Sequence, residues 1–266
     1  MTPPKWSVNA PLLDEYLHQL RLPTFAHNWQ SFAQDATKSG CPYDSYLMAL
    51  TDGEIAHREQ TRHALRIKTA RFPNLKELAD FDFALVPSLN KTAILELARG
   101  DYLTNIENLI LVGNPGLGKT HVAIGLALAA CRQGQRVRFY NAATLVNDLL
   151  SAQDQHQTEH FIAAARKQRL IVLDELGFIP FTPSGAQLLF QFCSSLHDHV
   201  TLIITTNLKF ADWVQVFGSD TLTAALLDRL THRAHILEFS GAESFRFKQR
   251  LKRQSKGGEP VNSKAT

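Results

Sequence analysis

The sequence lacks any uninterrupted apolar run long enough to span a bilayer, and its first residues, MTPPKWSVNAPLLDEY, lack the apolar core of a secretory signal peptide. Its three cysteines, Cys41, Cys131 and Cys193, are odd in number and widely spaced. This arrangement favours reduced, buried thiols in a cytoplasmic protein over a disulfide or metal framework. Neither zinc-finger spacing nor an aromatic RNA-binding signature occurs.

The chain as a whole also lacks a large net charge of either sign, since its formal net charge is only +3. The distribution is nevertheless uneven. Residues 54–71 carry five Lys and Arg against two Glu, and residues 246–266 carry seven against one, so the remainder is acidic. Two basic segments on an acidic body suggest a polyanionic partner that particular elements bind.

The first part of the chain has the apolar periodicity of helices over residues 11–71, with breaks at Pro23 and at the Gly40-Cys41-Pro42 turn. A further break is predicted near Asp52-Gly53. Phe72-Pro73 should end the helical segment, because a residue before proline disfavours the helical conformation.

Four regions are therefore expected along the chain. They are a helical N-terminal domain (1–73), a connector (74–107) with one short helix at 92–98, a core domain (108–254), and a polar, disordered tail (255–266).

The core begins with the octapeptide GNPGLGKT, which fits the P-loop pattern G-x-x-x-x-G-K-[ST] at every fixed position. The apolar segment 108–112 before it is predicted to be a buried strand, and the Ala- and Leu-rich segment 121–131 after it a helix. Such a loop directs backbone N–H groups and a helix N-terminus at a triphosphate. The residues expected to bind the nucleotide are Gly113, Asn114, Pro115, Gly116, Leu117, Gly118, Lys119, Thr120 and His121.

Short apolar runs alternate with longer amphipathic segments after the P-loop, which predicts an α/β fold with a parallel sheet covered by helices on both faces. Strands are expected at 109–112, 137–140, 170–173, 202–205 and 235–239. Helices are expected between them at 143–151, 161–168, 184–197 and 221–230. Ligands of such sheets bind at the carboxyl ends of the strands, where the P-loop lies.

Two acids follow the predicted strand LIVL. Asp174 is placed to hold a hydrated Mg²⁺ together with Thr120, and Glu175 to polarise the water that attacks the γ-phosphate. Acid pairs after strands also occur as solvated loop starts, but their position after a P-loop in an alternating chain favours the catalytic interpretation. The cofactors expected are ATP and Mg²⁺.

Two further residues are candidates for the reaction. Asn207 ends the apolar strand VTLIITT and could orient the attacking water or touch the γ-phosphate, although an Asn at this place could instead cap the next helix or turn. Arg229, near the end of an amphipathic helix, could be the arginine supplied to a neighbouring subunit's γ-phosphate. Arg233 lies four residues on and could take either role, and surface ion pairing is the alternative for both.

These motifs carry a family resemblance. GNPGLGKTHVAIGLALAACRQGQRVRFYNAATLVNDLL, LIVLDELGFIP, TLIITTNLKFADWVQVFG and AALLDRLTHRAHILEFSGAESFR resemble the IstB family of transposition helper ATPases, AAA+ proteins related to DnaC-type helicase loaders. The resemblance implies an AAA+ P-loop fold without a full lid domain, ATP-dependent assembly on double-stranded DNA as a homo-oligomer, and recruitment or activation of a partner transposase. It assigns Lys119 and Thr120 to Walker A, Asp174 and Glu175 to Walker B, and Asn207 to sensor 1, and it implies that Arg229 is the arginine that acts in trans.

The candidates for contact with DNA are basic residues of the N-terminal helices. Arg58, Arg62 and Arg66 recur every four residues, with Lys68 and Arg71 nearby. Such a stripe can neutralise phosphates, although a solvated face or a subunit contact would have the same pattern. The tail residues Lys248, Arg250, Lys252 and Arg253 are equally ambiguous.

Three other functions remain open at this point. A replicative helicase loader would share the chemistry, and a P-loop scaffold would bind ATP without significant turnover. A small-molecule P-loop kinase is less consistent with the sequence, because no acceptor pocket or lid is evident and the acid pair suits hydrolysis.

Overall fold

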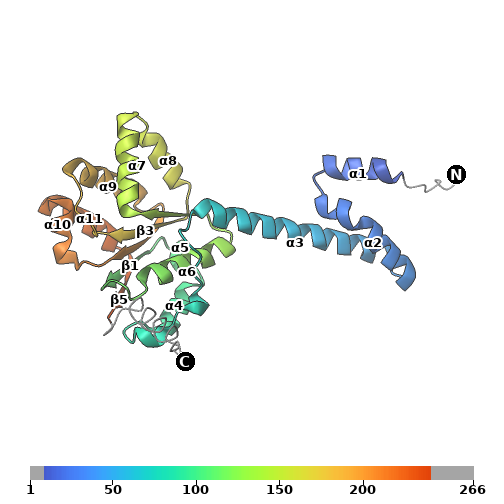
Figure 1. Cartoon of the computed structure of the whole chain (residues 1–266), viewed down its shortest axis with the longest axis horizontal. Coiled ribbons are helices and arrows are strands. Elements are labelled where there is room, and N and C mark those ends of the chain that lie inside the picture. Colours follow the sequence, from blue (N-terminus) through green and yellow to red (C-terminus); the bar gives the residue numbers. More distant parts are fainter. Residues whose placement is uncertain (1–8, 241–266) are drawn as a thin grey trace, which may run out of the picture. The chain divides into compact units, whose positions relative to one another are not determined.

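The computed structural model describes residues 9–240, which belong to two compact units, Met1–Leu65 and Arg66–Thr266 (Figure 1). The boundary between the units falls inside the longest helix. Several predictions concern residues outside the described part of the chain. They are the basic tail residues, the tail at 255–266, the end of the expected core and the expected absence of a lid domain. Within that part, no helix is long and apolar enough to cross a bilayer.

The first unit contains α1 (Ala10–Gln19), α2 (Pro23–Ser39) and most of α3 (Tyr43–Ala70). Trp29 Nε1 donates a 2.9 Å hydrogen bond to Asp14 Oδ1 and so joins α2 to α1. Gly40 ends α2 in the left-handed conformation, at φ 64°, as glycine does after many helices.

One prediction for this unit is wrong, because α3 runs without a break through Asp52 and Gly53. Gly53 lies against α2, where a Cβ would come within 3.5 Å of Thr24 Cγ2. The adjacent Glu54 accepts a 2.9 Å hydrogen bond from the N–H of Thr24. These contacts to α2 offset the low helix propensity of a single glycine.

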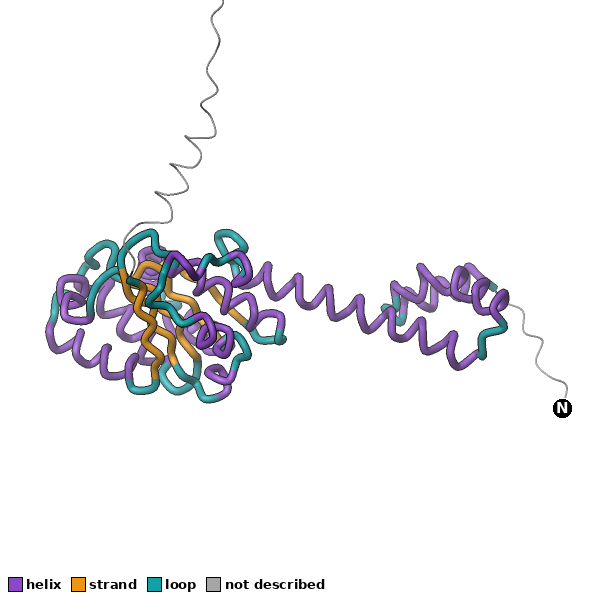
Figure 2. Tube along the Cα trace, turned by 90° about the horizontal axis from the view of Figure 1, so that it is seen from below, coloured by secondary structure: helices purple, strands orange, loops and turns teal. Residues whose placement is uncertain are grey.

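The second unit has a five-stranded parallel sheet in the order β2-β3-β4-β1-β5. Figure 2 shows its strands in orange among the helices. All five strands lie where the alternation of the sequence predicted them, and the α/β class is confirmed. The strands are β1 (Asn108–Gly113), β2 (Val137–Asn141), β3 (Leu170–Leu176), β4 (Thr201–Thr206) and β5 (Ala234–Phe239).

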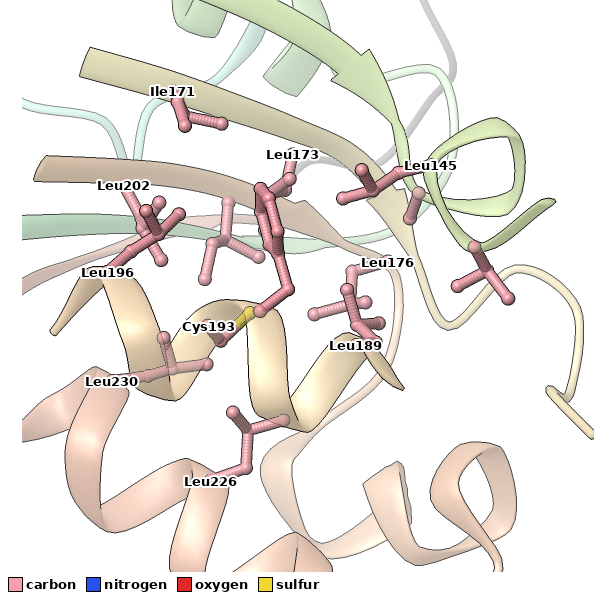
Figure 3. Packing of buried hydrophobic residues seen from close by; sticks show 14 of the residues in the cluster. Leu145, Ile171, Leu173, Leu176, Leu189, Cys193, Leu196, Leu202, Leu226 and Leu230 are labelled. Carbon is pink, nitrogen blue, oxygen red and sulfur yellow. The ribbon is translucent and has the colours of Figure 1, made fainter. Parts of the chain in front are cut away.

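Helices cover both faces of the sheet because alternate strand residues point to opposite sides. Leu109 and Leu111 belong to one apolar cluster with α6 (Lys119–Arg132), whereas Ile110 belongs to a second cluster on the other face. That second cluster is formed by α7 (Ala142–Asp154), α8 (Thr158–Arg166), α9 (Pro183–Leu196) and α11 (Asp220–Thr231). Figure 3 shows Leu196 of α9 beside Leu202 of the sheet and Leu189 of α9 beside Leu176.

Several short elements were not predicted. The connector contains, besides α4 (Lys91–Leu97), the elements η1 (Leu78–Asp80), η2 (Phe83–Leu85) and α5 (Asp101–Thr104). After β4 come η3 (Phe210–Trp213) and α10 (Val214–Phe217). Segments of three or four residues are too short to show a period, and packing decides their conformation.

All three cysteines are free thiols; Cys131 and Cys193 are buried, as expected, whereas Cys41 is half-buried, contrary to the expectation. Burial raises the pKa of Cys131 to about 11 and that of Cys193 to about 12, so both stay protonated and unreactive at neutral pH.

Candidate functional site

The loop between β1 and α6 takes conformations that need glycine. Gly113 has φ 149°, and a Cβ there would lie 2.1 Å from the carbonyl oxygen of Phe239. Gly118 has φ 90°, and its Cβ would lie 2.5 Å from Phe81 Cε2. No side chain caps the N-terminus of α6, so its first N–H groups are not used by a capping residue. They can receive an anion instead.

Lys119 begins α6 and folds back over this loop. Its Nζ donates hydrogen bonds to the carbonyl oxygens of Gly113, at 2.6 Å, and Asn114, at 2.9 Å. The residue is only 6% exposed. A largely buried cation therefore lies beside the loop that is expected to hold the phosphates.

The carboxylate of Asp174, on β3, faces the start of α6. Its Oδ1 accepts a hydrogen bond of 2.8 Å from Thr120 Oγ1 and another of 2.6 Å from Thr205 Oγ1. Burial raises the pKa of Asp174, and the two hydroxyl donors oppose that rise. A hydroxyl and a carboxylate oxygen this close together match the hard oxygen ligands that Mg²⁺ prefers.

Glu175, in contrast to Asp174, is exposed and has an unusual backbone. Its φ is 59°, in the left-handed region that side chains rarely adopt. Its N–H donates a 2.9 Å hydrogen bond to Thr205 Oγ1, and its Oε2 accepts one of 3.0 Å from Asn141 Nδ2. Backbone strain of this kind often occurs at functional sites.

A cavity of about 410 Å³ brings many of the candidate residues together, although Gly113, Asn114 and Asp174 are not part of its lining. Glu175, Thr205 and Asn207 contribute to its wall from the carboxyl ends of β3 and β4. The P-loop lines it with residues 115–121, and the connector lines it with residues that include Asp80, Phe81 and Asp82. The volume lies within the range typical of small-molecule sites.

Asn207 lies on this wall, and within residues 9–240 its side chain caps neither the next helix nor the turn after β4, where Thr206 Oγ1 accepts the Leu208 N–H. The next helical element, η3, has no side-chain cap hydrogen bond. The function of Asn207 in orienting water stays a prediction.

Sequence reasoning missed Asn141 and the connector residues. Asn141 directly follows an apolar strand, which is the same signal that drew attention to Asn207, but no nucleotide-binding pattern covers it. The connector precedes the P-loop, and only the fold brings Phe81 against Gly118.

Comparison with known proteins agrees with this geometry. A family model described as "IstB-like ATP binding protein" matches residues 15–253. The chain belongs to this family. It is 32% identical over 244 residues to a protein of Geobacillus stearothermophilus whose name describes it as an ATP-binding protein of insertion sequence IS5376. The match covers 92% of this chain and 97% of that one. It is 33% identical over 240 residues to the corresponding IS21 protein of Pseudomonas aeruginosa, covering 90% of each.

Solved structures show the same fold for this IstB-like chain. A DNA replication initiation factor matches with a TM-score of 0.52 and 20% identity, over 70% of this chain and 56% of the other. DnaA from Aquifex aeolicus with bound AMPPCP matches with a TM-score of 0.51 and 19% identity, over the same shares. The AAA+ P-loop fold expected from the sequence is confirmed.

Arg229 of the IstB-like chain lies elsewhere, on α11 against α9. Its Nη1 donates a 2.7 Å hydrogen bond to Ser194 Oγ, and its Cζ lies 4.8 Å from the ring centroid of Phe190. Among the described residues that line the nucleotide cavity, Arg229 does not occur. The structure does not bring it to the site of its own chain, and its action on another subunit stays a prediction.

The basic candidates on α3 divide between the two units. In the first unit, Arg58 donates from Nε to Glu54 Oε1 at 2.7 Å and from Nη2 to the carbonyl oxygen of Arg21 at 2.6 Å, while Arg62 is exposed. In the second unit, Lys68 and Arg71 are exposed and Arg66 is half-buried. Arg58 therefore has a structural role in its own unit, and contact of the stripe with DNA stays a prediction.

Proposed function

We propose that this protein is an ATP-dependent, DNA-binding helper of transposition that assembles on target DNA and recruits or stimulates a partner transposase. The observation that carries the ATPase part is the 2.8 Å hydrogen bond from Thr120 to Asp174, with Glu175 and Asn207 on the wall of the same cavity. Family membership and relatives named for insertion sequences support transposition.

The residues of the cavity divide the work of hydrolysis. Lys119 and the first N–H groups of α6 would hold the phosphates. Thr120 and Asp174 would hold Mg²⁺, which neutralises phosphate charge when bound. Glu175 would accept a proton from the attacking water, and Asn207 would orient that water.

Assembly would complete the site. Arg229 is held away from the cavity of its own chain, so the proposal assigns it to the γ-phosphate of a neighbouring subunit. A composite site of this kind would link turnover to oligomer formation on DNA.

Three measurements on the full-length protein test this function. ATP turnover with and without duplex DNA decides whether the protein is a DNA-linked ATPase, and zero turnover in both would leave the scaffold alternative. Strand transfer by the transposase of the same mobile element, with and without this protein and ATP, tests the helper role. Binding to a replicative helicase instead of that transposase would favour the helicase loader.

A further inference from the structure

Strand β3 contains a β-bulge at its two acids. Leu173 pairs with Ile204 of β4 and Leu176 pairs with Thr206, so three steps along β3 correspond to two along β4. Asp174 and Glu175 therefore lie opposite one residue, Thr205. An extra residue in a bulge loses its regular place in the hydrogen-bond ladder and redirects its side chain.

The hydroxyl of Thr205 supplies the contacts that this bulge needs. It accepts the hydrogen bond of the Glu175 N–H at 2.9 Å and donates its own proton to Asp174 Oδ1 at 2.6 Å. Thr205 is only 1% exposed, so its hydroxyl lies out of reach of bulk water. One buried group thus fixes the backbone of one acid and the carboxylate of the other.

The consequence for the site is geometric. Normal alternation would put adjacent strand residues on opposite faces. Here the left-handed conformation of Glu175, at φ 59°, leaves Glu175 on the wall of the cavity while Asp174 accepts the hydrogen bond of Thr120. We propose that Thr205 is a positioning residue for hydrolysis, whose hydroxyl holds the bulge that presents Glu175 to the cavity and Asp174 to Thr120.

This inference rests on the proposed ATPase function, and its test uses three variants of the full-length chain. Thr205→Val removes the hydroxyl with little change of shape, and Thr205→Ser keeps it. Thr206→Val is the matched control. Thr206 is also buried and on β4, but its Oγ1 accepts a 3.1 Å hydrogen bond from the Leu208 N–H and contacts neither acid in the described structure.

The first readout needs no nucleotide. Amide hydrogen exchange of Glu175 should accelerate roughly tenfold in Thr205→Val, because its N–H loses its acceptor. The rate in Thr205→Ser should stay within about twofold of wild type, and Thr206→Val should leave Glu175 unchanged. Unchanged exchange in Thr205→Val would overturn the proposal.

The second readout separates binding from turnover. Thr205→Val should lower kcat by about 10²-fold, since a displacement of about 1 Å at the chemistry has that effect, and KM should rise only as far as the Mg²⁺-dependent part of ATP binding is lost. Thr205→Ser should recover most of the rate. Wild-type kcat in Thr205→Val, an equal loss in Thr205→Ser, or an equal loss in Thr206→Val would each contradict a specific role for the hydroxyl.

A third readout keeps the two proposals apart. Fluorescent ATP binding is compared in Mg²⁺ and in EDTA. Thr205→Val should match wild type in EDTA and lose most of the gain in affinity that Mg²⁺ brings, because Asp174 is no longer held. If wild type hydrolyses no ATP, the proposed function fails, while exchange and Mg²⁺-dependent binding still decide the role of Thr205. Normal Mg²⁺-dependent binding in Thr205→Val would count against that role.

Discussion

Asn141 Nδ2 donates a hydrogen bond to Glu175 Oε2 at 3.0 Å, while Asn141 Oδ1 accepts the N–H of Ala143 and caps α7. A single side chain at the end of β2 thus connects the start of a helix to the proposed general base. The hydrogen bond restrains the position of the Glu175 carboxylate.

Releasing this restraint should raise turnover in the absence of DNA. Asn141→Ser keeps a capping oxygen for α7 but lacks the amide donor that reaches Glu175. We expect basal kcat to rise by about 2–10-fold, the value of one modest hydrogen bond. Steady-state hydrolysis without DNA measures it, and Asn141→Asp, which keeps the cap and repels Glu175, should do the same. A fall in both variants would mean that Asn141 holds Glu175 in its productive position.

The P-loop lysine and Glu175 should have separable effects. Lys119→Ala removes a phosphate-facing cation and should weaken ATP binding by roughly 10–100-fold. Glu175→Gln should spare binding but lower kcat by about 10²–10⁴-fold, because an amide cannot accept the proton of the attacking water. Titration with a fluorescent nucleotide measures ATP binding, and phosphate release measures kcat. Wild-type turnover in Glu175→Gln would refute its assignment as the base.

The sequence was sufficient to predict the strands of the sheet and the P-loop, because each depends on a local pattern of residues. Apolar runs set the five strands, and GNPGLGKT sets the loop and the start of α6. The bulge at Asp174 and Glu175 could not be predicted, because it depends on the register between β3 and β4. Likewise, Gly53 has the local signature of a helix break, and only its packing against Thr24 shows why α3 continues.

The pairing of Arg58 with Glu54 makes a prediction about stability and pH. The Glu54 side chain is 5% exposed. Burial raises the pKa of Glu54, but hydrogen bonds from Arg58 and Thr24 outweigh burial and lower it below the ordinary 4.5. A lowered folded-state pKa means that the ionised form stabilises the fold above the unfolded-state value. That contribution is lost as the pH falls through the folded-state pKa.

Arg58→Ala should therefore destabilise the protein by roughly 1–3 kcal/mol at pH 7, because it leaves a buried carboxylate without its charged donor. The difference from wild type should shrink as the pH falls below 4.5. Urea denaturation across this range measures it. Arg62→Ala, one turn further along α3 and exposed, is the control that should lose little. Equal losses in both variants would contradict a specific Arg58–Glu54 contribution.

Arg229 should act on a neighbouring subunit. Arg229→Ala should lose about 10³-fold or more in kcat. Mixing inactive Arg229→Ala with inactive Lys119→Ala should restore part of the activity, because the Lys119→Ala subunits still carry Arg229. Ser194→Ala, which removes the hydroxyl that Arg229 contacts, should keep its activity and controls for disturbed packing. No recovery at any mixing ratio would count against donation in trans.

DNA binding should depend mainly on phosphate contacts and little on base sequence. Counterion release then makes log affinity fall linearly with log salt, at about −0.9 per phosphate contacted. Arg62→Ala with Arg66→Ala should weaken binding to all duplexes alike and flatten that slope by up to about two. Arg58 is left intact in this variant because its loss would disturb Glu54.

The control for that experiment is Lys38→Ala, which removes a cation that is 77% exposed and lies outside the stripe, in the first unit together with Arg62. It should change neither affinity nor slope, since a charge that contacts no phosphate releases no counterion. If the double variant keeps both affinity and slope, Arg62 and Arg66 do not contact DNA, and the DNA site lies elsewhere on the chain. If unrelated duplexes of equal length differ strongly in affinity, binding is sequence-specific.

ATP should tighten binding to every duplex, because an oligomer presents many weak sites at once and raises the effective concentration of each.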